Sequence, residues 1–350
     1  MFLKNAWYVA AWGRELADKP LPVSILGESV VLFRGKEGRA AALADKCPHR
    51  RLPLSMGRVR EGELECGYHG LTFDRTGACT RAPCSAQIPD RAFVRAYPIE
   101  ERYGLLWIWM GLPEQADAST IFPVEHWGDP SWGCNEGGIM DVRCNYQHIT
   151  DNLLDPSHVA WVHVSSFASS ACEATPVEVD SGANGVTVSR WMMDSDVPPF
   201  YAPFVKFAGR CDRKQQYEVR FPSLALIKAV LVPGGSGGEG RPLHADAFVM
   251  DSYNFMTPVD EHRTRYYWFQ MRNFAPGDAA VSEAMSAGVK AAFEEDRVIL
   301  EAVDKGMGDE PYPGVAMKID RGPMQFRRRL QRLITEEQTA ATPMLAASTA

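Results

Sequence analysis

The sequence predicts an α+β protein in which a small all-β domain at the N-terminus precedes a larger α+β domain built on a curved antiparallel sheet with helices. Length is the first observation, because 350 residues exceed what one hydrophobic core usually supports. Short apolar runs interrupted by glycines fill the first 110 residues, a pattern typical of short strands joined by turns. Beyond residue 111, longer apolar runs alternate with segments of helical periodicity, which indicates a mixed domain.

In the first domain we expect strands at 23–26, 30–34, 40–44, 63–66, 71–74 and 105–110. A polar stretch at 111–119 follows and marks a domain boundary. We therefore divide the chain into a first domain at 1–112, a second domain at 113–336 and a flexible, polar and alanine-rich tail at 337–350.

In the second domain the periodicity predicts helices around 144–163 and 279–306. Strands are expected at 186–193, 217–221, 224–232, 245–257 and 264–273. The stretch 233–241 is rich in glycine, but no helix is expected to begin there and no Lys-Ser or Lys-Thr follows it. It is therefore predicted to be a flexible loop, not a phosphate-binding one.

Composition argues against several kinds of partner. The formal net charge of −7 argues against nucleic acid. No run of about 18 apolar residues could cross a membrane, and the opening residues lack the pattern of a secretory signal peptide. Of the eight cysteines, the six outside the motif described next show no disulfide-like framework, so we expect a protein of the reducing cytoplasm.

The most specific motif is a pair of short loops, Cys47-Pro-His49 and Cys66-Gly-Tyr-His69, which offer two thiolates and two imidazoles. This C-x-H and C-x-x-H pair is typical of a Rieske [2Fe–2S] cluster, in which the thiolates hold one iron and the imidazoles the other. A structural zinc site is the alternative, but zinc loops usually pair like ligands, whereas each loop here carries one of each kind. We therefore predict that the chain moves single electrons.

A second group of possible metal ligands lies in the predicted helix at 144–163. His158 and His163 form an H-x4-H pair, and on a regular α-helix their side chains would stand about 140° apart. A π-turn or a broken turn would bring both to one face, and Pro156 already disturbs hydrogen bonding here. Two imidazoles with one carboxylate suit an open mononuclear Fe(II) site, whereas an isolated pair of this spacing is more often structural.

The third ligand is expected from the helix at 279–306. Its apolar stripe runs through Val281, Met285, Val289 and Ala292 and continues beyond Asp296 to Ile299 or Leu300 and to Val303. Asp296 thus takes a core position, where a carboxylate is costly unless it is paired or bound to metal. A buried salt bridge or a cap is the alternative. Glu294, Glu295 and Arg297 fall largely on the solvent side.

The chain resembles the oxygenase component of the Rieske non-haem iron oxygenases over nearly its whole length. The similar segments are Asn5-Ala-Trp-Tyr-Val-Ala10, Cys47-Pro-His-Arg, Cys66-Gly-Tyr-His-Gly-Leu, Tyr103-Gly-Leu-Leu-Trp-Ile-Trp109, Asp151-Asn-Leu-Leu-Asp155 and Phe293-Glu-Glu-Asp-Arg297. Within that superfamily it is most similar to the vanillate O-demethylase oxygenase group, whose relatives include dicamba and toluenesulfonate monooxygenases.

The resemblance implies roles for these residues. Cys47 and Cys66 would bind the inner iron of the cluster and His49 and His69 the outer one. The mononuclear Fe(II) would be held by a facial triad made of His158, His163 and Asp296.

Two further residues are expected beside the triad. Asp155 lies one helical turn before His158, so its carboxylate can reach the free ring nitrogen of that histidine. In the family this aspartate bridges to a Rieske histidine of a neighbouring subunit in a head-to-tail trimer, which here would be His69. Asn152 is expected near the iron, and a capping or packing amide is an equal alternative.

Lys228 is the one charge inside the apolar run 224–232. A lysine in such a strand either extends to an edge or meets an anion, so it is a candidate for binding a substrate carboxylate. The basic run at 327–332 is more often a solvated helix face than a docking patch.

The resemblance implies the terminal oxygenase of a multi-component system, with O2 as co-substrate and a small methoxylated aromatic acid of the vanillate type as substrate. Demethylation would release formaldehyde. Because no glycine-rich turn opens a helix that could bind a dinucleotide, electrons from NADH would come through a separate flavin and [2Fe–2S] reductase. Alternatives are hydroxylation of a ring or a methyl group of an aromatic acid or sulfonate and, from another class, a Rieske electron carrier without a substrate.

Overall fold

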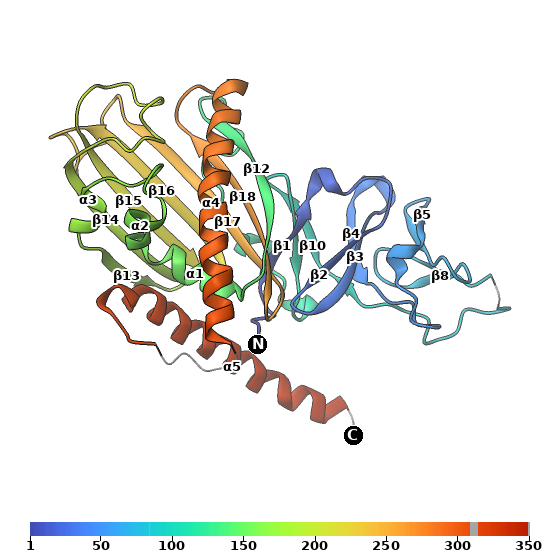
Figure 1. The fold of residues 1–350 in the computed structure, drawn as a ribbon. Coiled ribbons are helices and arrows are strands. Elements are labelled where there is room, and N and C mark those ends of the chain that lie inside the picture. The colour runs from blue at the N-terminus through green and yellow to red at the C-terminus, as the bar shows by residue number, and fades with distance from the viewer. Residues whose placement is uncertain (84, 309–313, 349–350) are drawn as a thin grey trace. The chain divides into compact units, whose positions relative to one another are not determined.

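The computed structural model describes residues 1–83, 85–308 and 314–348 (Figure 1). The chain forms two compact units. The first consists of Met1–Pro123 with Thr257–Glu261 and Ile334–Ala350, and the second of Val124–Met256 with His262–Leu333. The first boundary between the compact units thus lies after residue 123, near the predicted boundary at 112. Two later segments of the chain also belong to the first unit.

The first unit contains three small antiparallel sheets. One has the order β1 (Trp7–Trp12), β11 (Leu105–Trp109), β10 (Ile99–Arg102). The second has the order β2 (Leu21–Ile25), β3 (Glu28–Arg34), β4 (Ala40–Ala44), β9 (Ala96–Tyr97). The third has the order β5 (Arg58–Arg60), β6 (Glu63–Glu65), β7 (Thr72–Phe73), β8 (Cys79–Arg81).

Strand β3 is apolar on both faces because it separates two hydrophobic clusters. Val30 and Leu32 point into one cluster, whereas Val31 and Phe33 point into the other. The second cluster also contains Cys47 and Cys66. Packing of this core therefore fixes the positions of both predicted ligand loops.

The second unit is a seven-stranded antiparallel sheet with helices on one face (Figure 1). The strand order is β12 (Gly133–Val142), β18 (Arg263–Arg272), β17 (Phe248–Asp260), β16 (Leu224–Pro233), β15 (Cys211–Arg220), β14 (Gly185–Ser195), β13 (Glu178–Gly182). The helices are α1 (Tyr146–Leu153), α2 (Val159–Val162), α3 (Ala171–Ala174), α4 (Ala279–Met307) and α5 (Arg321–Ser348). Short 3-10 helices occur in both units. The first unit contains η1 (Gly13–Glu15), η2 (Lys36–Gly38), η3 (Leu54–Met56), η4 (Pro113–Gln115) and η5 (Ala118–Thr120), and the second contains η6 (Pro156–His158) and η7 (Lys318–Asp320).

Helix α4 has the amphipathic character expected of it. Asp278 caps its first turn, because its Oδ1 accepts a hydrogen bond from the N–H of Val281 at 3.0 Å. The buried stripe includes Val289, Asp296 and Leu300, and Ile299 is 46% exposed, so Leu300 continues the stripe. The carboxylate of Asp296 therefore faces the sheet, as the periodicity predicted.

The sequence missed some elements. Strand β12 is rich in glycine and resembles a loop in sequence, but a side chain at Gly137 would lie 1.3 Å from the carbonyl oxygen of Trp268 on β18. Helix α5 includes residues 337–348 of the predicted tail, while 349–350 lie outside the described residues. The flexibility of that segment stays a prediction.

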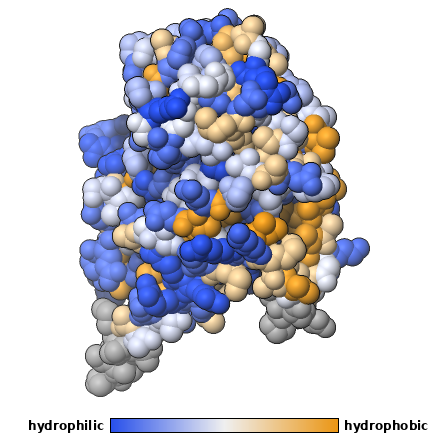
Figure 2. All heavy atoms as spheres, turned by 90° about the vertical axis from the view of Figure 1, so that its left-hand side faces the viewer, coloured by the Kyte–Doolittle hydropathy of each residue, from blue (hydrophilic) through white to orange (hydrophobic). Residues whose placement is uncertain are grey.

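No helix in the described part of the chain is long and apolar enough to cross a membrane. On the face drawn in Figure 2, hydrophobic side chains gather in small groups among hydrophilic ones.

Candidate active site and metal centres

The two cysteine–histidine loops of the first unit have the same backbone hydrogen-bond pattern. In each, the cysteine N–H donates to the carbonyl five residues later, and the cysteine carbonyl accepts from the N–H four residues later, at 2.8 to 3.1 Å. The fourth residue after the cysteine is left-handed in both loops: Arg51 has a φ of 63° and Gly70 a φ of 71°. These matching loops present Cys47 and Cys66 side by side.

The donor set fits a Rieske cluster. Both thiols are 2% exposed. Burial raises the pKa of Cys47, the neighbouring Cys66 thiol raises it further, and the backbone N–H groups of His49 and Arg50 act in the opposite direction. Amides directed at a buried sulfur stabilise the thiolate that binds iron.

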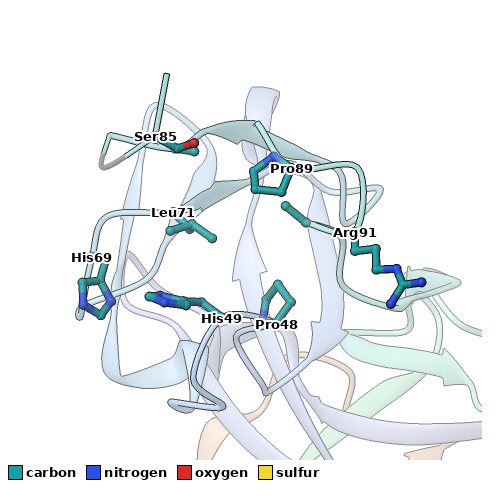
Figure 3. A pocket seen from close by; sticks show the side chains of 9 residues that line it. Pro48, His49, His69, Leu71, Ser85, Pro89 and Arg91 are labelled. Atoms are coloured by element: carbon teal, nitrogen blue, oxygen red, sulfur yellow. The ribbon is translucent and has the colours of Figure 1, made fainter. Parts of the chain in front are cut away.

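The two histidine rings lie next to each other, with 4.6 Å between their centroids. They border a cavity of about 390 Å³, which we call the cluster cavity, and Figure 3 shows both rings at its edge. The other labelled residues around it are Pro48, Leu71, Ser85, Pro89 and Arg91. All four predicted cluster ligands therefore converge on one end of the first unit.

In the second unit, a broken helix brings the predicted mononuclear iron ligands together. Helix α1 ends at Leu153, η6 makes a tight turn that ends at His158, and α2 adds four residues. His163 then leaves helical geometry, with a φ of −103° and a ψ of 39°. The predicted break in the helix is therefore present as a 3-10 turn that ends at His158 and a helix end at His163, with one α-helical turn between them, and not as a π-turn.

The ligand atoms of His158, His163 and Asp296 all lie within 4.8 Å of one another. Asp296 Oδ1 is 3.7 Å from Nε2 of His158 and 3.3 Å from Nε2 of His163. Asp296 is 7% exposed and has no lysine or arginine within ion-pair distance among the described residues. A buried carboxylate that faces two imidazoles and no cation is the donor set of a 2-His-1-carboxylate iron site.

Each ligand is held by a second group. The Nδ1 of His158 lies 2.5 Å from the backbone oxygen of Asp155, and the Nδ2 of Asn152 donates to Oδ1 of Asp296 at 3.2 Å. Asn152 therefore lies beside the triad, as expected. The carboxylate of Asp155 does not orient His158, contrary to expectation, because the backbone carbonyl already occupies that ring nitrogen. The carboxylate accepts hydrogen bonds from the N–H and hydroxyl of Ser157, and both end on Oδ1.

Glu295 is a site residue that the sequence analysis placed on the solvent side. Its Oε2 lies 2.7 Å from Nδ1 of His163, although the side chain is 38% exposed. Burial lowers the pKa of His163, but the carboxylates of Asp296 and Glu295 outweigh burial and raise it overall. A carboxylate behind a ligating histidine fixes its tautomer and makes it a stronger ligand.

The triad opens onto a cavity between the sheet and the helices, which we call the metal cavity. Its lining is mostly aromatic and aliphatic, with Phe167, Tyr201 and Phe293 among the aromatic members. A second cavity of about 570 Å³, the helix cavity, lies beside α4 and α5 and is lined by Asn152, Asp155 and Arg327 among others. His158 lines both cavities.

The geometry does not support Lys228 as the group that binds a substrate anion. Its strand neighbour Ile227 lines the metal cavity, and successive side chains of a strand point to opposite faces. On that opposite face the Nζ of Lys228 lies 3.4 Å from Asp251 and 3.5 Å from Glu125. Lys228 therefore compensates the charge of Asp251, which is fully buried.

Part of the predicted basic run has a structural role. Arg327 on α5 donates to both carboxylate oxygens of Asp151 at 2.9 and 2.8 Å. Arg329 donates to the backbone oxygens of Gly185 and Ala183.

Comparison with known proteins agrees with these two metal centres. Residues 6–98 match the Rieske [2Fe-2S] domain, and residues 142–336 match the vanillate O-demethylase oxygenase C-terminal domain. A putative toluene-4-sulfonate monooxygenase system iron-sulfur subunit of Comamonas testosteroni is 40% identical over 98% of this chain and 100% of its own length. A vanillate O-demethylase oxygenase subunit of Pseudomonas sp. strain HR199 is 36% identical over the whole of both chains.

Among solved structures, dicamba monooxygenase bound to 3,6-dichlorosalicylic acid is 30% identical, with a TM-score of 0.89 over 97% of this chain and 99% of that one. Another structure of dicamba monooxygenase contains non-haem iron. The chain therefore belongs to the vanillate O-demethylase oxygenase family of the Rieske non-haem iron oxygenases, as a terminal oxygenase component that carries a [2Fe–2S] cluster and a mononuclear iron.

Proposed function

We propose that this protein demethylates a methoxylated aromatic acid of the vanillate type, with O2 as co-substrate and NADH as the source of electrons. The observation that carries the proposal is that the triad lines the metal cavity, whose other walls are mostly aromatic and aliphatic. Such walls favour a flat apolar ring over a polar substrate. When bound, the mononuclear iron supplies O2 activation, with electrons that arrive through the cluster.

The reaction consumes O2, two electrons and two protons. One oxygen atom enters the methyl C–H bond, and the other leaves as water. The resulting hemiacetal breaks its C–O bond and gives a phenol and formaldehyde. The chain's own contribution is positional, because the aromatic walls hold the ring and Asn152 and Glu295 keep the ligands in place.

A second candidate is hydroxylation of a methyl group on an aromatic sulfonate. The relative named as a toluene-4-sulfonate monooxygenase subunit is 40% identical, compared with 36% for the vanillate enzyme. The same iron and the same cavity would serve both reactions. The two candidates differ in the product, which is formaldehyde and a phenol in one case and a benzyl alcohol in the other.

We further propose that electrons cross between subunits of a homotrimer through Asp155. Its carboxylate borders the helix cavity, and the hydrogen bonds that it accepts from Ser157 both end on Oδ1, so that Oδ2 has no hydrogen-bond donor among the described residues. That oxygen is therefore available to a histidine N–H from outside this chain, and His69 of the partner subunit is the candidate. The backbone carbonyl of Asp155 would complete the connection to the iron, because it contacts the Nδ1 of the iron ligand His158.

The test is a product screen with the purified holoprotein, a surrogate flavin and [2Fe–2S] reductase, NADH and O2. Formaldehyde formed in proportion to NADH from vanillate or a related methoxybenzoate would support demethylation. A hydroxymethyl product from 4-toluenesulfonate, without demethylation, would favour the second candidate. If the enzyme turns over neither acid, both proposed reactions, demethylation and methyl hydroxylation, are contradicted.

Iron content separates an oxygenase from an electron carrier. The ligands assigned above account for about three irons per chain in an oxygenase and about two in a carrier without a second site. About two irons per chain, with a complete Rieske spectrum, would contradict the oxygenase.

A further inference from the structure

The metal cavity contains a charge that the iron site does not explain. Arg213 on β15 lines this cavity together with the triad, and it is 1% exposed. Apart from the two ligating histidines, it is the one side chain with a cationic group among the described residues that line the cavity. A buried guanidinium is costly unless an anion or a full set of acceptors compensates it.

The contacts of Arg213 leave it incompletely satisfied. Its Nη1 donates to the backbone oxygen of Phe167 at 2.8 Å and lies 3.8 Å from the sulfur of Cys172. The guanidinium also forms a hydrogen bond with the hydroxyl of Tyr201, and its carbon lies 5.2 Å from the centre of that ring. Its Nε has no hydrogen-bond partner in the described part of the chain. No carboxylate of those same residues makes an ion pair with it.

The neighbouring strand provides a contrast within the same sheet. Arg190 on β14 is also buried, at 4% exposed, and no carboxylate among the residues that the structure describes makes a close ion pair with it, although Asp155 lies near enough to act on its charge. All three of its nitrogens, however, have acceptors. Nε donates to Gln215, Nη1 to the backbone oxygens of Cys172 and Thr175, and Nη2 to that of Pro156, at 2.6 to 3.1 Å. Each nitrogen of Arg190 therefore has an acceptor, whereas the Nε of Arg213, a residue that lines the same cavity as the iron ligands, has none in the described part of the chain.

We propose that Arg213 binds the anionic group of the substrate, a carboxylate or a sulfonate on an aromatic ring. A guanidinium offers paired N–H donors that match the oxygens of either group. This inference rests on the proposed activity toward an aromatic acid and names the group that recognises the acid. The pairing would fix which end of the ring points toward the iron ligands.

The cavity must enlarge for such a ligand to enter. The enclosed space is about 60 Å³, which suits water better than an aromatic acid. Phe167 and Tyr201, which form part of its wall, come from segments outside the sheet, and their ring centres lie 5.5 Å apart. Arg213 contacts both residues, so a movement of this part of the wall would also change the surroundings of its guanidinium.

The test measures binding separately from turnover. Calorimetric titration of the anaerobic holoprotein would give dissociation constants for vanillate, its uncharged methyl ester and 4-toluenesulfonate. In Arg213→Met, which keeps an unbranched stem about as long as the part of arginine up to Nε and removes the charge, we expect the dissociation constant for the preferred acid to rise about 10- to 100-fold. The constant for the methyl ester should change less than about threefold, because its binding does not depend on the charge.

Lys214→Met is the matched control. Lys214 is the next residue on the same strand and lies on the opposite face, where it is paired only loosely with the exposed Glu239 at 3.5 Å. Its substitution removes the same charge and should leave the affinity for the acid unchanged. Arg213→Lys keeps a charge without the guanidinium geometry, and the acid should bind it with intermediate affinity.

Several results would overturn the inference. One is that wild type and Arg213→Met bind the acid with equal affinity. Another is that the substitution lowers the affinity for the acid and for its ester by the same factor. A third is that the wild type binds neither acid. If Arg213→Met does not fold, Arg213→Lys decides, because it should bind the preferred acid more weakly than the wild type does, and an affinity equal to that of the wild type would overturn the inference. Formaldehyde production with no dependence on Arg213 would contradict this inference alone, whereas charge-dependent binding without formaldehyde would contradict the proposed reaction alone.

Discussion

Replacing Glu295 tests whether the residue behind His163 tunes the iron site. In Glu295→Gln the amide oxygen can still accept from the Nδ1–H of His163, so the ring should keep its orientation but lose the adjacent negative charge. In Glu295→Ala both the acceptor and the charge disappear. The two variants therefore separate the effect of charge from the effect of orientation.

The expected magnitude follows from the contact. The carboxylate is 2.7 Å from a ring that is only 5% exposed, and groups in this position usually change metal affinity about 10- to 100-fold. Because Glu295 itself is 38% exposed, solvent screens its charge, and we place Glu295→Gln near the lower end, at about tenfold, or about 1.4 kcal/mol. Glu295→Ala should approach the upper end.

The assay removes the mononuclear iron with a chelator, confirms that the Rieske spectrum is intact, and titrates Fe(II) back anaerobically against a competing chromogenic chelator. Glu294→Gln is the matched control, because Glu294 is the adjacent residue and pairs with Arg297 on the outer side of α4. An unchanged Fe(II) dissociation constant in both Glu295 variants would refute the reasoning. An equal change in Glu294→Gln would show that only the overall charge of the helix matters.

Asp296→Ala should keep the visible and EPR spectra of the Rieske cluster while product formation disappears, because it empties only the second metal site; retained turnover would mean that the third ligand is another residue. Asp155→Asn should keep both metals, since the backbone carbonyl that holds His158 remains, but cluster oxidation in a single turnover should become much slower. A normal single-turnover rate would exclude the proposed route through Asp155. Lys228→Met should lower the free energy of unfolding by about 3 kcal/mol near neutral pH, measured by urea denaturation, because it leaves buried Asp251 without its cation. Burial already raises the pKa of Asp251, with Lys228 opposing it, so the deficit should shrink as the pH falls and the carboxylate is protonated; a deficit independent of pH would contradict this role of Lys228.

The metal ligands could be predicted from the sequence because metal chemistry allows few residue types. Cysteine and histidine at short fixed spacing rarely serve any purpose but metal binding, and Asp296 stood out as a charge within an apolar stripe. The interaction of Glu295 with His163 could not be predicted in this way, because the two residues lie 132 positions apart and the helical pattern places Glu295 on the polar side.

Arg213 and Lys228 show why strand patterns were less informative. Strand β15 has polar residues on both faces, so alternation does not reveal which face is buried or that Arg213 lies inside. Lys228 stood out as a lone charge in an apolar run, but its partner Asp251 comes from the next strand of the sheet, opposite it in register. Pairing of this kind depends on the register between strands, which no local sequence pattern specifies.

His158 borders two cavities, and this arrangement has a kinetic consequence. On the proposed route through Asp155, substrate and product would use the metal cavity on one side of this imidazole, and electrons would arrive from the helix cavity on the other side. Reduction of the mononuclear iron and release of the product could then overlap in time. A small molecule bound in the helix cavity would block electron transfer to the iron. It would therefore lower kcat without raising KM.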